Sequence, residues 1–142
     1  MSKIEIDHVS QHNMSSRPRL CHLKKWSGKQ GYGFDLYSNS NNSSLNIIGN
    51  IDFDSPAEAT GLKKNDYIVE INFKNIKNLN HNQIVDLIRN GIEVEENVYN
   101  KDEVIILVID NEAKEYYDDL NIQVNSKMKN ILKFTTPDKL SF

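Results

Sequence analysis

The segment Gly31–Tyr32–Gly33–Phe34 constrains the fold of this chain more than any other stretch, because two glycines flank an aromatic residue there. Glycine adopts positive φ without steric cost and lets other groups approach the backbone closely. A loop of this composition can direct several N–H groups into one concavity that favours an anion. Residues 34–37 then alternate between apolar and polar side chains, which predicts a strand. We therefore predict a carboxylate site at the edge of a sheet, with the lysines of residues 24–30 nearby.

Nucleotide-binding loops also contain glycines, but this segment departs from their common patterns. A dinucleotide site of the Gly-x-Gly-x-x-Gly type needs glycine at position 36, where this chain has Leu36, and it needs a helix that begins there. A P-loop needs Gly-Lys followed by Ser or Thr, which does not follow this segment. For Gly-x-Gly by itself, the remaining alternative is an ordinary tight turn without a ligand.

Composition and charge disfavour several classes of function. The 142 residues suggest one domain, and a net charge of −3 without a basic block makes nucleic acid a poor partner. Cys21 is the single cysteine, which rules out an internal disulfide and fits a reducing, cytoplasmic environment. The histidines show no metal-ligand spacing, and no apolar run reaches the length of a membrane span. We expect a non-enzymatic protein that uses no cofactor, metal or small-molecule substrate.

Apolar periodicity and capping residues predict strands interrupted by two helices. Ser55 predicts the start of a short helix that ends near Gly61, and Asn80 with Gln83 predicts the start of a longer helix that ends at Gly91. Strands are predicted at 19–25, 34–38, 45–52, 67–72, 74–76 and 104–109. Polar composition predicts a disordered leader at 1–17, a flexible connection at 38–44 and a loop at 93–100.

This order of elements, with Gly-Tyr-Gly-Phe between the first two strands, resembles a PDZ domain, and several segments are similar to the NHERF (sodium–hydrogen exchanger regulatory factor) scaffolds. The segments that carry the similarity are Arg19–Leu23, Gln30–Phe34, Ser55–Ala59, Asp66–Asn72 and Leu107–Asp110. The resemblance implies an α+β fold, a partly open antiparallel β-barrel or sandwich of five to six strands with two helices. It places the PDZ domain at 18–110, between the leader 1–17 and an extension at 111–142 that is partly helical or disordered.

The same resemblance implies a site for C-terminal peptides, which would add a strand to the edge of residues 34–37. The peptide carboxylate would be bound by Gly31, Tyr32, Gly33 and Phe34. The last side chain of the ligand would enter a hydrophobic pocket formed by Tyr32, Phe34, Leu36, Val85 and Ile88. His81 would select Ser or Thr two residues before the ligand's end, and Asp52 would favour a basic residue next to that end. The implied partners are the C-terminal tails of channels, transporters or receptors that end in Ser/Thr-x-hydrophobic, bound by a cytoplasmic adaptor at the inner face of the plasma membrane.

Three departures from the family pattern lead to further expectations. Asn72 is followed by Phe73 where the family has glycine, so we expect a different turn there, because positive φ is uncommon for a bulky residue. Asn65 replaces another family glycine, a milder change because asparagine visits the left-handed region. Residues 92–100 lengthen the connection after the second helix. In addition, Gly49 stands where NHERF-like domains often carry arginine, so a preference for an acidic residue further upstream in the ligand is not expected.

Two binding alternatives remain open. Lys24, Lys25 and Lys29, with Trp26 between them, could associate with a membrane surface, although they are few for that role. The sequence Lys-Leu-Ser-Phe at 139–142 could support weak self-association through its own carboxylate, although Leu140 does not suit His81.

Overall fold

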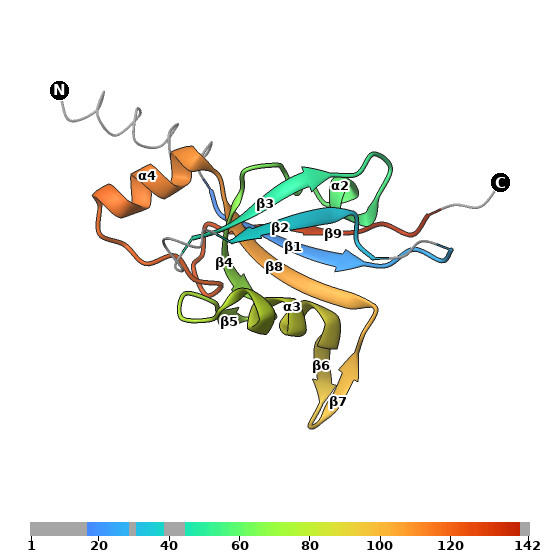
Figure 1. Cartoon of the computed structure of the whole chain (residues 1–142). Helices are drawn as coiled ribbons and strands as arrows, with labels where there is room; N and C mark the ends of the chain where they lie inside the picture. Colours follow the sequence, from blue (N-terminus) through green and yellow to red (C-terminus); the bar gives the residue numbers. More distant parts are fainter. Residues whose placement is uncertain (1–16, 29–30, 39–44, 140–142) are drawn as a thin grey trace.

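The computed structural model describes residues 17–28, 31–38 and 45–139, and these form an open mixed sheet with helices on it (Figure 1). Residues 1–16 of the predicted leader and most of the predicted flexible connection lie outside the described residues. The strands are β1 (Arg19–Lys24), β2 (Phe34–Ser38), β3 (Asn46–Ile51), β4 (Tyr67–Ile71), β5 (Lys74–Asn75), β6 (Ile92–Glu95), β7 (Val98–Asn100), β8 (Glu103–Ile109) and β9 (Leu132–Thr135). The helices are α2 (Pro56–Ala59), α3 (His81–Asn90) and α4 (Asn111–Asp119).

The main sheet has the strand order β2-β3-β4-β8-β1-β9, with β5 paired to β4 and a separate two-stranded sheet of β6 and β7. Pairings within the main sheet are antiparallel except for β1 with β9, which is parallel. The predicted α+β class and the partly open sheet are confirmed. Beyond the six strands and two helices predicted individually, the structure has the strand β9, the hairpin β6–β7 and a third helix, α4, which lies in the extension expected to be partly helical or disordered.

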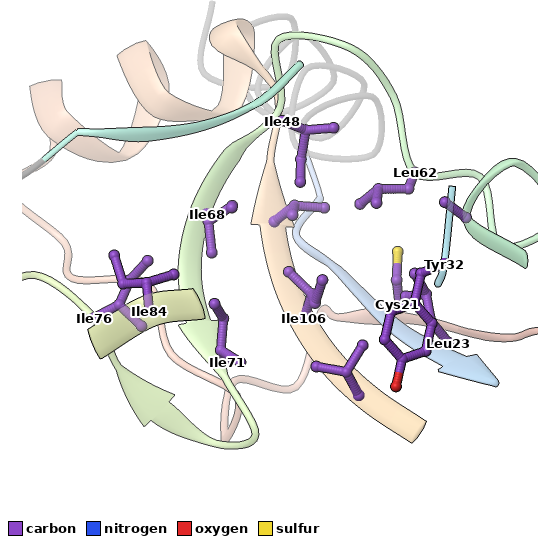
Figure 2. Close-up of a cluster of buried hydrophobic side chains, with 13 residues drawn as sticks. Cys21, Leu23, Tyr32, Ile48, Leu62, Ile68, Ile71, Ile76, Ile84 and Ile106 are labelled. Carbon is purple, nitrogen blue, oxygen red and sulfur yellow. The ribbon is translucent and has the colours of Figure 1, made fainter. Parts of the chain in front are cut away.

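Two clusters of buried side chains hold the two faces of the sheet. The larger cluster includes Cys21, Tyr32, Ile48, Ile84 and Ile106, so it joins the central strands to the Gly-Tyr-Gly-Phe loop and to α3 (Figure 2). The second cluster joins β8 to α4 and the segment after it, with members Leu107, Ile109, Ala113, Tyr117, Val124 and Ile131. The alternation of side chains along β8 supplies both clusters, which is why this strand is buried along most of its length. The domain limits predicted from the sequence stay a prediction.

The two predicted helix starts are confirmed in detail. The side chain of Ser55 accepts a hydrogen bond from the N–H of Glu58 at 3.2 Å at the start of α2. At α3, Asn80 and Gln83 cap each other reciprocally, each at 2.9 Å. These bonds satisfy N–H groups that have no partner inside a helix.

The loop predicted at 93–100 is wrong, because the structure has the hairpin β6–β7 there, which extends away from the main sheet (Figure 1). Apolar residues alternate with glutamates in β6, the pattern of a half-exposed strand, but the acidic composition concealed it. Asn97 adopts φ 61° in the turn, and its N–H donates to Glu93 Oε2 at 3.0 Å. An asparagine with positive φ is typical of a tight hairpin turn.

The expectation of a different turn at Asn72–Phe73 is also wrong. Both residues adopt positive φ, 51° and 66°, so the tight turn is kept without glycine. The side chain of Asn72 explains this: its Nδ2 donates to the carbonyls of Leu87 and Gly91, at 3.1 and 2.9 Å, and its Oδ1 accepts from the N–H of Ile105 at 2.9 Å. These three bonds hold the Asn72–Phe73 turn against α3 and β8. Phe73 adopts positive φ because it is the next residue of that turn. Asn65 adopts φ 73°, which fits the expectation for asparagine at that position.

We predict that Phe73→Gly raises the free energy of unfolding by about 1 kcal/mol, because glycine relieves the positive-φ penalty and the exposed Phe73 ring loses little packing. Urea unfolding at 25 °C measures the change. Phe73→Ala is the matched control: it keeps a Cβ at positive φ and should not stabilise. Equal unfolding midpoints for the two variants would contradict this interpretation.

Candidate functional site

The candidate site is built from an edge strand and a helix that faces it, which we call the β2–α3 site and define by Phe34, Leu36, Ser38, His81, Val85 and Ile88. In the order of the main sheet, β2 stands at one end, so only one of its edges is paired with a strand among the described residues. Phe34 and Leu36 are half-buried against the larger cluster. Ser38, at the next alternate position, meets the first residue of α3, with 3.0 Å between Ser38 Oγ and His81 Nδ1. An unpaired strand edge can accept another strand.

The Gly-Tyr-Gly-Phe loop turns its carbonyl groups into the protein. Gly31 and Gly33 adopt φ 75° and 90° on either side of Tyr32. The carbonyl of Tyr32 accepts from the N–H of Ala57 at 2.9 Å, and the carbonyl of Gly33 accepts from the N–H of Asp52 at 2.8 Å. Among the described residues, the N–H groups of Tyr32 and Gly33 donate no backbone hydrogen bond in return. The loop therefore has fixed carbonyls and N–H groups left to serve an anion.

Both its positive φ and its contact with Ser55 require glycine at position 33. A Cβ added to Gly33 would lie 2.3 Å from Ser55 Cβ and 2.6 Å from Ser55 Oγ, whereas a Cβ on Gly31 would meet no atom within 4 Å. Ser55 cannot move freely, because it caps α2 and its Oγ also donates to the carbonyl of Asp52 at 2.8 Å. The loop is therefore seated directly on the start of α2.

We predict that Gly33→Ala lowers the free energy of unfolding by about 2–3 kcal/mol, because it combines positive φ with a clash. Gly31→Ala has only the positive-φ penalty and should cost about 1 kcal/mol. Urea unfolding of both variants tests the difference. An equal loss for the two would show that the contact with Ser55 does not restrict the loop.

Tyr32 lies in the core rather than at the surface. Its ring is 6% exposed and joins the larger cluster, close to Leu23 and Cys21 in Figure 2. The Tyr32 hydroxyl is 3.5 Å from the carbonyl oxygen of Lys101, and burial raises the pKa of this phenol well above its ordinary value. Lys25 places its ammonium 5.3 Å from the centre of the Tyr32 ring, so one positive charge lies beside the loop. Tyr32, which was predicted to line the ligand pocket, therefore exposes little of its surface.

The other predicted pocket residues lie on β2 and α3. Ile84 is fully buried in the larger cluster. Val85 and Ile88 are half-buried, and Ile88 packs against the same cluster together with Phe34 and Leu36. Leu87 is half-buried and also packs there. Ile88 therefore serves the core as well as the β2–α3 site.

Asp52 follows β3, is exposed, and lies beside the loop because its N–H is bonded to the carbonyl of Gly33. Gly49 on β3 is buried beside Tyr37 and Asp35 of β2: an added Cβ would lie 2.7 Å from the ring of Tyr37 and 3.0 Å from Asp35 Cβ. The Tyr37 ring covers the position at which an arginine side chain would begin.

Sequence reasoning missed Ser38 and Asn46, which the structure connects to His81. Ser38 Oγ donates to Asn46 Oδ1 at 2.7 Å, and the two residues are opposite each other in the pairing of β2 with β3. A signal was available: Ser38 has the same strand parity as Phe34 and Leu36, so it must face α3 if they do. The run of serines and asparagines that follows concealed it as part of a connection.

The described residues hold no cluster of three or more metal-ligating side chains, and none of the helices described is long and apolar enough to cross a membrane. A cavity of about 580 Å³ lies between β4 and the segment after α4, lined in part by Asn46, Tyr67 and Gln123. Trp26, considered above for membrane association, donates from Nε1 to the carbonyl of Pro137 at 2.9 Å, and Lys139 Nζ lies 4.8 Å from its ring centre. Lys29 and residues 140–142, on which the two binding alternatives depend, lie outside the described residues.

Comparison with known proteins agrees with this geometry. The family model for the PDZ domain matches residues 21–98. The chain is 36% identical over 106 residues to the Na(+)/H(+) exchange regulatory cofactor NHE-RF2 of Mus musculus, and 37% identical over 106 residues to the protein of the same name from Oryctolagus cuniculus. Each alignment covers 75% of this chain but only 28% and 30% of the respective relative. The matched part thus spans less than a third of the length of those relatives.

Proposed function

Because the chain belongs to the PDZ domain family and is similar to Na(+)/H(+) exchange regulatory cofactors, we propose that it is a non-enzymatic adaptor that binds the C-terminal tails of membrane proteins at the β2–α3 site. Family membership makes it a protein-interaction domain. The observation that carries the finer proposal is that two features adjoin. Among the described residues, the N–H groups of Tyr32 and Gly33 donate no backbone hydrogen bond, and one edge of β2, which begins at that loop, has no paired strand.

The binding mode follows from the chemistry of the strand edge. An extended peptide that pairs with β2 satisfies the backbone groups on its free edge, and main-chain hydrogen bonds supply affinity that does not depend on sequence. A peptide that ends at the loop brings its carboxylate to the N–H groups of Tyr32, Gly33 and Phe34, with Gly31 completing the turn. Hydrogen bonds to a charged acceptor are about twice as strong as neutral ones, and the ammonium of Lys25 lies beside the loop.

Specificity comes from the side chains that face the peptide. Leu36, Val85 and Ile88, with Phe34 and the buried Tyr32 beneath, provide apolar surface for the last residue of the ligand. His81 at the start of α3 can accept a hydrogen bond from a Ser or Thr hydroxyl two residues earlier. Asp52 beside the loop favours a basic residue at the ligand position between the Ser or Thr and the last residue. The expected ligand therefore ends in Ser/Thr-x-hydrophobic, with a free carboxylate.

The expected partners are tails of channels, transporters or receptors, which would bring the protein to the cytoplasmic face of the plasma membrane. The name of these relatives refers to the regulation of Na(+)/H(+) exchange, which fits a role beside a membrane transporter. A short peptide on one strand edge supports modest affinity, with a Kd of roughly 1 μM, or about −8 kcal/mol.

We predict that a fluorescent peptide ending in Thr-Arg-Leu binds as the free acid and that the C-terminal amide binds at least tenfold more weakly. The amide lacks the negative charge that would accept hydrogen bonds from the N–H groups of the loop. His81→Ala should weaken binding of the acid by about three- to tenfold through loss of one hydrogen bond. Fluorescence polarisation measures both affinities.

The control is Tyr99→Ala, on β7 and exposed away from the β2–α3 site, which should leave both affinities unchanged. Equal affinity for acid and amide would mean that the loop is a turn without a ligand, and the proposed function would fall while the fold would stand.

A further inference from the structure

Three side chains form a continuous line from inside the sheet to the start of α3. Asn46 Oδ1 accepts from Ser38 Oγ at 2.7 Å, and Ser38 Oγ lies 3.0 Å from His81 Nδ1. Asn46 is only 2% exposed, Ser38 is half-buried and His81 is exposed. The line therefore connects the buried amide of Asn46 to His81, the side chain proposed to select Ser or Thr in the ligand.

The direction of the hydrogen bonds in this line determines the tautomer of the neutral His81 imidazole. A carbonyl oxygen only accepts, so the Ser38 hydroxyl uses its single proton on Asn46 Oδ1. The Ser38 oxygen can then only accept from His81, so Nδ1 carries the hydrogen. In a neutral imidazole one nitrogen donates and the other accepts, which leaves His81 Nε2 as an acceptor.

We infer that Ser38 and Asn46 are positioning residues that hold His81 in its Nδ1–H tautomer and so determine the preference for Ser or Thr in the ligand. This inference rests on the proposed function. With Nε2 as acceptor, a ligand hydroxyl has a partner, whereas an aliphatic side chain at that position leaves the nitrogen without one. The preference then depends on a serine and an asparagine that do not themselves contact the ligand's hydroxyl.

The direction of the line depends on the orientation of the Asn46 amide. In the structure Oδ1 meets Ser38, and Asn46 Nδ2 is buried with no hydrogen-bond partner among the described residues. The reversed amide would donate to Ser38, the hydroxyl would donate to His81 Nδ1, and Nε2 would become a donor. The two arrangements thus predict opposite tautomers, which can be measured without any ligand.

The test is two-bond ¹H–¹⁵N correlation spectroscopy of the full chain at about pH 8, above the pKa of histidine in model peptides. The His81 signals are assigned by their loss in His81→Gln. We expect the Nδ1–H pattern in the wild type, a shift toward the Nε2–H form in Ser38→Ala, and the wild-type pattern in Ser38→Thr, which keeps the hydroxyl. Asp35→Ala, on the other face of the same strand, is the matched control and should not change the pattern.

A second readout is the ratio of the affinities for peptides ending in Thr-Arg-Leu and Val-Arg-Leu. We expect Ser38→Ala to reduce this ratio by about three- to tenfold and Ser38→Thr to preserve it. A wild-type Nε2–H tautomer, or an unchanged tautomer in Ser38→Ala, would overturn the inference alone, because neither depends on peptide binding. The expected tautomers with no binding of either peptide would instead overturn the proposed function, and with it the role in specificity.

Discussion

The contact between Gly33 and the capped start of α2 is the constraint on which the binding geometry depends. Ser55 caps α2, bonds to the carbonyl of Asp52 and occupies the space where a side chain at position 33 would begin. The same start of α2 supplies the N–H of Ala57 to the carbonyl of Tyr32. Because the loop's carbonyls are held from behind, its N–H groups remain on the side where β2 begins. A short helix thus fixes the position of the loop that we propose as the carboxylate site.

The sheet connects this loop to the rest of the chain through its two packed faces. One face carries the cluster that includes Tyr32 and Ile84, and so fixes the loop and α3 relative to each other. The opposite face is covered by α4 and the segment after it, and β9 extends the sheet beside β1. The unpaired edge of β2 lies at the other end of the strand order from β9. Among the described residues, the segment 111–139 therefore packs on the far face and far edge of the sheet, and that edge of β2 has no strand paired to it.

Local sequence signals predicted the elements whose causes are local. The capping residues Ser55 and Asn80 predicted both helix starts, and the glycines on either side of Tyr32 predicted the loop. Features that depend on distant contacts were not predictable. Phe73 adopts positive φ because Asn72 bonds to residues of α3 and β8, and Ser38 matters because β3 brings Asn46 beside it. The assignment of peptide-binding roles to His81 and Asp52 comes from family resemblance, and geometry adds to it only for His81.

The most direct test of the central claim is an ¹⁵N–¹H correlation spectrum recorded while the chain is titrated with a peptide ending in Thr-Arg-Leu. If the loop binds the peptide carboxylate, we expect the amide protons of Tyr32, Gly33 and Phe34 to move furthest downfield, because their N–H groups would donate to it. Smaller shifts should follow along β2 and the exposed face of α3. The largest shifts at the hairpin β6–β7, or around the cavity between β4 and the segment after α4, would contradict the account.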